Sequence, residues 1–469
     1  MRPRSFFVVL VWLAQANVVL ASGFMASKMG GDLSGPTEDN AAAIFWNPAA
    51  IGPIEGMSVF LDGNSIWRTQ RFERSWPATY DPGAREADPG TMRAFAFQPM
   101  AAVTARPGLD WLTIGAAFYA PYGHRSDWPD WDIDAEREKE IEDQAAPSQA
   151  FHSLLGGIRA MYFTPAFSFR VLDWLWLGGG VSMVYAEVDS LRARDWAPDL
   201  EAVLGIELER ETVEHSGLAG MDFTGYGWAW SLGVFARPWH FLRFGLSFTS
   251  GTSLDLEGRT WLTLPPPFLT LLYGERVDSD ARLSMELPPA LRFGIQWDIL
   301  DWLVFRVHSE VVFWSVYEQV RIHELAFENE HGPVTGDLGE VTEFVSRRDY
   351  VDTVDVRAGF RFFPVPWWML FVGGGFDSCA APEKNNTPDL YDAPKFGLAG
   401  GTRIQLIPLL EWIMGAELDR DDRLALTVGF TWVHYLQYTV DESQADPPID
   451  GVHHSEAYLL NTNLEARFF

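Results

Sequence analysis

Three features are scarce in this chain of 469 residues: cysteine, positive charge and long apolar runs. The single cysteine, Cys379, excludes an intramolecular disulfide and any zinc site that several cysteines would form. The formal net charge of −29 argues against nucleic acid as a partner, because phosphates require a basic surface. After the N-terminus no run of about 18 apolar residues occurs, which excludes a transmembrane helix.

The N-terminus has the three parts of an export signal. Arg2 and Arg4 carry the positive charge, a short apolar stretch follows, and Ala21 is a small residue before the expected cleavage point. Residues 1–21 are therefore interpreted as a signal peptide, and the mature chain is expected to begin at Ser22. A membrane anchor is the alternative, but the apolar stretch is too short to span a bilayer.

From about residue 57 onward, large apolar side chains alternate with small or polar ones. In the segment 424–440, residues of one parity are mostly large and apolar or aromatic, and those of the other parity are mostly small. This period of two is typical of β-strands, and the runs are longer than the usual strand of about 5–6 residues. Similar runs occur at 112–120, 176–188, 226–236 and 243–257.

Tryptophan recurs at short corners of the sequence. Five tryptophans lie 63 to 65 residues apart: Trp111, Trp174, Trp239, Trp302 and Trp367. Between the corners lie long connections that are rich in Asp, Glu, Pro and Asn, at about 68–92, 123–150, 194–221, 258–280, 324–350, 378–394 and 441–456. This pattern indicates short turns at one membrane surface, where the tryptophans form an aromatic girdle, and long loops at the other.

The pattern predicts an all-β fold, a transmembrane antiparallel β-barrel formed by residues 57–469. Seven long and six short connections imply about 14 strands, an even number. The sheet must close, because an open edge in hydrocarbon would leave backbone groups unpaired at several kcal/mol each. A final strand at 458–469 ends in an aromatic residue and resembles the signal read by the barrel-assembly machinery. A large soluble β-protein is the alternative, but it would need turns about every 8–12 residues.

The segment before the first strand, residues 22–56, does not alternate. Gly, Ala and small polar residues dominate it. One or two helical turns are expected within residues 37–48, capped by Thr37 or Asp39 and ended by Pro48. Because the segment is too short to fold alone, we expect it to plug the lumen of the barrel as a hatch.

An ordered set of segments resembles one family, the outer-membrane transporters of long-chain fatty acids and aromatic hydrocarbons (FadL/toluene-transporter type). The resemblance runs from residue 22 to the end and rests on the order of its parts, since no single motif is specific. A longer connection at 407–422 departs from the family pattern. The matching segments are Ser-Gly-Phe at 22–24, an acidic Ala-rich stretch at 38–43, Asn-Pro-Ala at 47–49, and 118–123, 184–200, 248–258, 285–297, 375–383 and 392–401.

The resemblance implies uptake of hydrophobic compounds across the bacterial outer membrane, with long-chain fatty acids as the expected substrate and aromatic hydrocarbons as the alternative. It implies that the hatch carries a turn formed by Asn47, Pro48 and Ala49. It implies that the mature N-terminus lies close to an internal pocket, through Ser22, Gly23 and Phe24. It also implies lateral release where the third strand kinks, at Tyr119, Pro121, Tyr122 and Gly123.

One external connection is unusually apolar for a loop, and exposed apolar patches usually mark binding surfaces. We hypothesise that residues 260–274 and a helix-like segment at 199–209 form an outer groove that captures substrate. The alternative is that the two loops only stabilise each other as a cap. The groove residues are Trp261, Leu262, Leu264, Phe268, Leu269, Leu271, Leu272, Leu200, Val203, Leu204 and Ile206.

The remaining motifs indicate no cofactor, no metal and no catalysis. The acidic stretch 124–144 and the pair His453 and His454 are more typical of solvated loops than of cation sites, and residues 419–422 lack the spacing of a calcium loop. No Ser/His arrangement indicates an enzyme. Lipopolysaccharide, membrane lipid and the assembly machinery are the expected partners of a monomer, and an adhesin or structural barrel is the alternative without transport. Arginines in or near strands are candidates to bind a substrate carboxylate: Arg159, Arg170, Arg243, Arg292, Arg306 and Arg357.

Overall fold

The structure is a computed structural model that describes most of the mature chain. Among the described residues, no helix is both long enough and apolar enough to cross a bilayer. The expected signal peptide and Ser22 lie outside the description, and so does most of the connection at 407–422. The described residues are 23–25, 28–31, 33–75, 89–129, 131–139, 147–266, 268–334, 337–408, 423–445 and 448–468.

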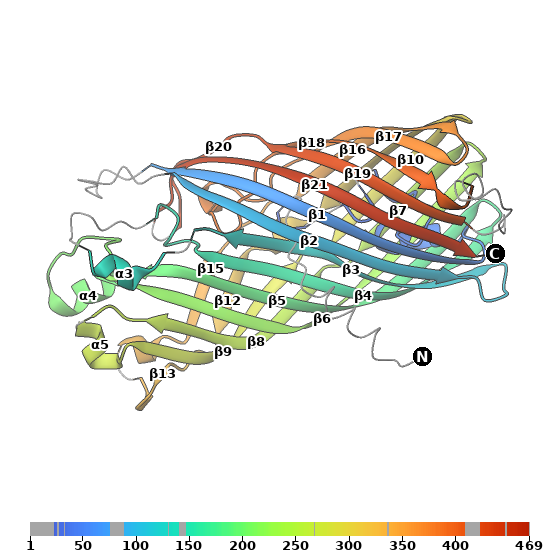
Figure 1. The fold of residues 1–469 in the computed structure, drawn as a ribbon. Coiled ribbons are helices and arrows are strands. Elements are labelled where there is room, and N and C mark those ends of the chain that lie inside the picture. The colour runs from blue at the N-terminus through green and yellow to red at the C-terminus, as the bar shows by residue number, and fades with distance from the viewer. Residues whose placement is uncertain are drawn as a thin grey trace.

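The chain forms a closed antiparallel barrel of 14 strands, which confirms the predicted fold (Figure 1). Several strands are interrupted, so that two labelled segments in line make one strand. In chain order the strands are β1 (Met57–Arg74), β2 (Gly90–Ala105), β3 (Leu112–Asp127), β4 (Leu155–Leu172), β5 (Leu175–Asp195), β6 (Ser216–Trp239), β7 with β8 (Leu242–Thr249 and Thr252–Thr263), β9 with β10 (Arg276–Leu287 and Ala290–Leu300), β11 with β12 (Leu303–Val312 and Gln319–His323), β15 with β16 (Glu343–Arg347 and Thr353–Val365), β17 (Trp368–Asp377), β18 (Lys395–Gln405), β19 with β20 (Arg423–Tyr435 and Tyr438–Val440) and β21 (Gly451–Phe468).

The barrel closes between its first and last strands. β1 pairs with β2 on one side and with β21 on the other, from Met57 opposite Phe468 to Arg74 opposite Gly451. The interruptions have local causes. Pro288 and Pro289 separate β9 from β10, because proline has no N–H to donate to a ladder. The runs expected at 243–257 and 424–440 are likewise broken, at residues 250–251 and 436–437.

The two ends of the barrel differ as the corners of the sequence predicted. The five recurrent tryptophans stand in or beside tight turns, and between 38% and 56% of each is exposed, as expected for an aromatic girdle. The opposite end carries the long connections, with a small hairpin of β13 (Glu328–Asn329) and β14 (Gly332–Pro333) and with most of the helices (Figure 1). Those helices are α3 (Ile133–Arg137), α4 (Ala197–Leu204), α5 (Phe268–Tyr273), η4 (Asp337–Glu340) and η5 (Glu383–Asn385), whereas η3 (Trp314–Val316) lies between β11 and β12.

The outer face of the wall is apolar, the reverse of a soluble protein. Along β6, Tyr226, Trp228, Trp230 and Leu232 are exposed, whereas the intervening residues point into the lumen and are mostly buried. Aromatic side chains flank an aliphatic stretch on this face. This arrangement is typical of a strand that crosses an outer membrane.

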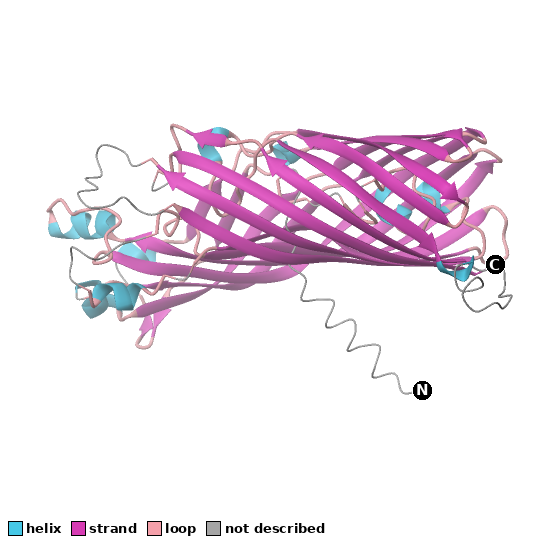
Figure 2. Cartoon of the chain, turned by 45° about the horizontal axis from the view of Figure 1, so that its top comes forward, coloured by secondary structure: helices cyan, strands magenta, loops and turns pink. Residues whose placement is uncertain are grey.

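The N-terminal segment lies inside the barrel, with two short helices, α2 (Ala43–Trp46) and η1 (Pro48–Ile51) (Figure 2). All the residues of both helices are buried. The expected helix cap was wrong. The N-cap is Ala42 and has no side-chain hydrogen bond, because Thr37 and Asp39 instead bind arginines of the barrel wall.

A charge placed on the lipid-facing side of β6 tests the orientation of the wall. Leu232→Arg should lower the free energy of unfolding by about 2–4 kcal/mol, because a guanidinium at the bilayer midplane is costly. Urea titration in lipid vesicles measures this change. Thr224→Arg, on the same face but nearer the external loops, is the control and should cost about 1 kcal/mol or less. Equal costs for both variants would contradict the assignment of this face to lipid.

Candidate functional site

The Asn47–Pro48–Ala49 turn fastens the N-terminal segment to the barrel wall. Asn47 Oδ1 accepts a hydrogen bond from the backbone N–H of Ala49 at 3.1 Å and so caps η1, and Pro48 occupies the first turn of η1. Asn47 Nδ2 donates to the carbonyl of Pro36 at 3.0 Å and to the carbonyl of Val234 on β6 at 2.9 Å. One side chain therefore closes the turn and binds it to the sheet.

Two wall glycines make room for this turn. A Cβ atom at Gly178 on β5 would lie 2.5 Å from the backbone nitrogen of Ala49. A Cβ atom at Gly233 on β6 would overlap Asn47 Oδ1. Both glycines allow the backbone of the segment to approach the sheet more closely than any side chain would permit.

Ion pairs also hold the middle of the segment, that of Glu38 buried and that of Asp39 partly exposed. Glu38 Oε2 lies 2.8 Å from Arg306 Nη1 and 3.4 Å from Arg361 Nη2, and Asp39 Oδ2 lies 2.8 Å from Arg243 Nη1. Burial by itself would raise the pKa of Glu38, but the two guanidinium groups outweigh it and lower the pKa to about 2. Both acids thus stay charged at neutral pH and bind the segment electrostatically.

The first described residues reach an aromatic cluster deep in the lumen. The Phe24 ring lies edge-on to Trp314, Tyr317 and Tyr122, with ring centroids 4.7, 5.2 and 6.2 Å away. Tyr350 contacts the same cluster through Trp314 and Tyr317. The backbone N–H of Gly23 donates to Asp392 Oδ2 at 2.9 Å. Gly23 and Phe24 therefore lie beside a buried aromatic cluster, and their closeness to a substrate pocket stays a prediction.

β3 stops pairing with β2 about half-way along its length. β2 and β3 pair from Ala105 opposite Ile114 only as far as Met100 opposite Tyr119. At the same level the register between β3 and β4 shifts between Tyr119 and Tyr122, which marks a bulge around Pro121. A kink thus lies at the residues that the resemblance singled out.

Other groups contact β3 where it no longer pairs with β2. Gln98 Nε2 on β2 donates to the carbonyl of Ala120 at 3.0 Å. The N-terminal segment pairs with β3 in place of β2: Met25 forms a bridge with Tyr122, and the Gly123 N–H donates to the Phe24 carbonyl at 2.8 Å. The kink, the N-terminal segment and the aromatic cluster therefore form one connected site.

Comparison with known proteins places this architecture in a family. The profile described as Outer membrane protein transport protein (OMPP1/FadL/TodX) matches residues 7–468. The chain belongs to this family. Family members are outer-membrane transporters of hydrophobic compounds rather than enzymes, so the resemblance seen in the sequence is confirmed.

Solved structures of the FadL/TodX family share the fold at low sequence identity. A FadL homologue from Pseudomonas aeruginosa is 14% identical, with 97% of this chain and 100% of that chain covered and a TM-score of 0.72. The toluene transporter TodX from Pseudomonas putida is 16% identical, with 97% and 100% covered and a TM-score of 0.61. The toluene transporter TbuX from Ralstonia pickettii is 16% identical, with 95% and 98% covered and a TM-score of 0.59. Sequence comparison with curated proteins finds no match.

The predicted outer groove is only partly apolar surface. Leu271 and Leu272 on α5 are 84% and 55% exposed, and Leu204 and Ile206 at the end of α4 are also exposed. The other described aliphatic groove residues, Leu200, Leu262, Leu264 and Leu269, are buried, and Trp196 Nε1 before α4 donates to the carbonyl of Thr263 at the end of β8 at 3.1 Å. Trp261 is half-buried under the Arg276 guanidinium, and the side chains of Phe268 and Val203 lie outside the description. The loops thus contact each other, as both the groove and the cap hypotheses require.

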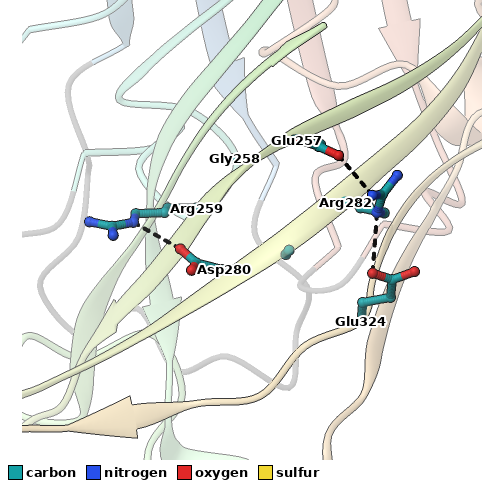
Figure 3. A pocket seen from close by; sticks show the side chains of 7 residues that line it. Glu257, Gly258, Arg259, Asp280, Arg282 and Glu324 are labelled. Carbon is teal, nitrogen blue, oxygen red and sulfur yellow. Dashed lines mark hydrogen bonds and ion pairs between the residues drawn. The ribbon is translucent and has the colours of Figure 1, made fainter.

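A surface hollow on β8 and β9 is charged rather than apolar. Arg282 lies 2.7 Å from Glu257, and Arg259 lies 2.9 Å from Asp280 (Figure 3). These side chains are largely exposed, and exposed ion pairs add little stability. Nothing in this hollow suits an apolar substrate.

The structure also describes the other candidate residues named from the sequence. Within the described part of the chain, no three His, Cys, Asp or Glu residues are grouped to hold a metal. Burial raises the pKa of the Cys379 thiol, which keeps it unreactive. Of the six candidate arginines, Arg170 is exposed and Arg159 half-buried, whereas the other four are buried or nearly so and each is paired with an acid. Sequence reasoning missed the role of Gln98, for which inward parity on β2 was the only available signal, and it named the acidic stretch at 38–43 without the partners of Glu38.

Neutralising the two acids should loosen the N-terminal segment. In Glu38→Gln the buried Arg306 loses its partner, which should cost about 3–5 kcal/mol of local stability, and Asp39→Asn should act in the same direction. Hydrogen exchange of residues 43–51 measures local opening. The exposed Glu55→Gln is the control and should change nothing. Unchanged exchange in Glu38→Gln would show that the ion pair does not hold the segment.

The same contact predicts how the segment responds to pH. The folded pKa of Glu38, about 2, lies below its ordinary value of 4.5. Its stabilising contribution is therefore complete above about pH 4.5 and is lost as pH falls towards 2. Exchange of residues 43–51 should stay slow from neutral pH down to about 4.5 after correction for intrinsic rates. Opening already at pH 6 would contradict this assignment.

Proposed function

We propose that the chain carries long-chain fatty acids across the outer membrane, by capture at the external loops, passage through an internal apolar pocket and lateral release at the β3 kink. The kink carries the proposal, because β3 separates from β2 directly beside the buried Phe24. Lateral release suits such a substrate, since it leaves an apolar pocket and enters lipid without crossing water. Residues 1–21 act as the export signal of this route.

In this proposal the N-terminal segment is the moving part. Residues 22–56 form the hatch, and Phe24 occupies the aromatic cluster when no substrate is bound. A substrate that replaces the Phe24 ring would also break the pairing of Met25 with β3. Gly23 adopts φ +61 beneath Trp314, a backbone conformation that glycine tolerates best. Movement of residues 23–25 therefore couples the pocket to the kink.

Aromatic hydrocarbons are a second candidate substrate, favoured by one observation. The cluster around Phe24 is built from Tyr122, Trp314, Tyr317 and Tyr350, and aromatic rings pack well against such edges. Uptake of labelled oleate and labelled toluene by whole cells that express the protein distinguishes the two. Uptake of neither compound would contradict transport and favour an adhesin or structural barrel.

Charges on the outer loops should reduce capture. Leu271→Asp and Leu272→Asp together should lower oleate uptake several-fold, because they remove the exposed apolar surface of α5 and repel a carboxylate. The barrel should keep its stability, since both side chains are exposed. Thr270→Asp, on the same helix, is the control for added charge. Normal uptake in the double variant would support the cap hypothesis instead.

Tying β2 to β3 should stop release. In a Cys379→Ser background, cysteines at Gln98 and Ala120 can be joined by a short, reducible bifunctional thiol reagent. Oleate uptake should fall to background after cross-linking and return on reduction. Cysteines at Ala102 and Ala117, which already face each other in the paired part of the two strands, are the control. Equal uptake with both cross-links would exclude release between β2 and β3.

A further inference from the structure

Arg68 is a buried cation with no acidic partner among the described residues. It lies on the inward face of β1 and is 3% exposed. Its Nε donates to Ser455 Oγ at 3.0 Å, and its Nη2 donates to the carbonyl of Tyr391 at 3.2 Å. Both acceptors are neutral. The charge of the guanidinium is therefore solvated in part but not balanced.

The other inward arginines differ from Arg68 in this respect. Each has a carboxylate within ion-pair distance, as expected for guanidinium groups away from water. The pairs are Arg243 with Asp39, Arg292 with Glu310, Arg306 with Glu38 and Arg357 with Asp355. Arg68 is thus an exception within the same lumen.

One side of Arg68 is apolar and aromatic. Its guanidinium carbon lies 5.1 Å from the Tyr435 ring centroid and 5.8 Å from that of Tyr391. A cluster of buried apolar side chains surrounds these rings: Ile66, Ala96, Ala393, Val433, Ala457 and Leu459. An isolated cation beside such a cluster matches a ligand that has one anionic group and an apolar body.

Several neutral polar groups beside Arg68 also lack partners. Gln70, next inward on β1 and fully buried, has no hydrogen-bond partner for Nε2 or Oε1 among the described side chains and backbone. The same holds for both ring nitrogens of His453 and for the Tyr391 hydroxyl. His453 stacks on Tyr391 with ring centroids 4.5 Å apart. Buried polar atoms are rarely unpaired, so a cluster of them indicates an absent ligand.

We propose that Arg68 and Gln70, at the seam between β1 and β21, bind the carboxylate of an amphiphilic acid whose apolar body lies along the Tyr391 and Tyr435 cluster. The guanidinium supplies charge-assisted hydrogen bonds, and the Gln70 amide supplies a further donor. The site deepens the proposed function, on which it rests, by naming the group that selects acids over neutral hydrocarbons.

The site is connected to the N-terminal segment. Lys395 Nζ lies 5.1 Å from the Tyr435 ring centroid and 2.6 Å from Asp392 Oδ1, and Asp392 Oδ2 accepts the Gly23 N–H. The same carboxylate therefore touches both the edge of the proposed site and the start of the hatch. An anion at Arg68 would therefore be linked, through Tyr435, Lys395 and Asp392, to the residues that cover the kink.

Binding of oleate and of oleyl alcohol tests the proposal, because the two probes share a chain and differ in charge. The purified full-length protein in detergent should bind ionised oleate more tightly than the alcohol. Arg68→Gln should weaken oleate binding about tenfold or more and leave the alcohol unchanged. Arg68→Lys should restore part of the loss. Arg71→Gln, on the exposed side of the same strand, is the control and should bind both probes normally.

Gln70→Leu provides a second variant that should keep the fold, because the Gln70 amide has no hydrogen-bond partner among the described residues. It should weaken oleate binding several-fold. Normal oleate binding in folded Arg68→Gln or Gln70→Leu, or equal losses for both probes, would overturn the site. Uptake by cells separates failure of the site from failure of transport. If cells with the wild-type protein and cells with Arg68→Gln take up oleate equally well, the site alone is refuted. Wild-type cells that take up neither oleate nor toluene would refute the proposed function.

Discussion

Backbone hydrogen bonding in lipid is the constraint on which the whole structure depends. A strand in hydrocarbon has no water to satisfy its N–H and C=O groups, so every edge must be paired. The seam between β1 and β21 meets this requirement along the full length of both strands. Closure in turn creates a lumen, and the lumen makes possible a buried N-terminal segment and the charged groups that hold it. The apolar outer face follows from the same requirement.

Where β3 leaves β2, the chain supplies substitute partners for the unpaired part of β3. Above Tyr119, β3 no longer pairs with β2, and the Gln98 side chain and the Met25 backbone take over. These contacts are fewer than those of a ladder and are made by groups that can move without unfolding the barrel. This part of the wall is the exit in the route proposed above for a substrate that partitions into lipid.

The N-terminal segment has two kinds of attachment to the wall. Asn47 and the ion pairs of Glu38 and Asp39 bind its middle, whereas residues 23–25 are held by Asp392, by their pairing with β3 and by aromatic packing around Phe24. Buried ion pairs are costly to separate, so the middle of the hatch is expected to stay in place. In the proposed route, a shift of the leading residues alone would expose the kink.

The sequence by itself determined the barrel, its strand number and the end that carries the tryptophan corners, because alternation and turn spacing are local properties of a two-residue period. It also indicated the Asn47 turn and the Tyr119–Gly123 kink through resemblance. Only the tertiary structure decided which arginines are paired, that Thr37 and Asp39 bind the wall instead of capping a helix, and that Arg68 has no acid beside it in the described part of the chain. Parity shows which side chains point inward, but partners in a closed lumen come from strands far apart in the chain. Their distances depend on curvature and register around the whole barrel.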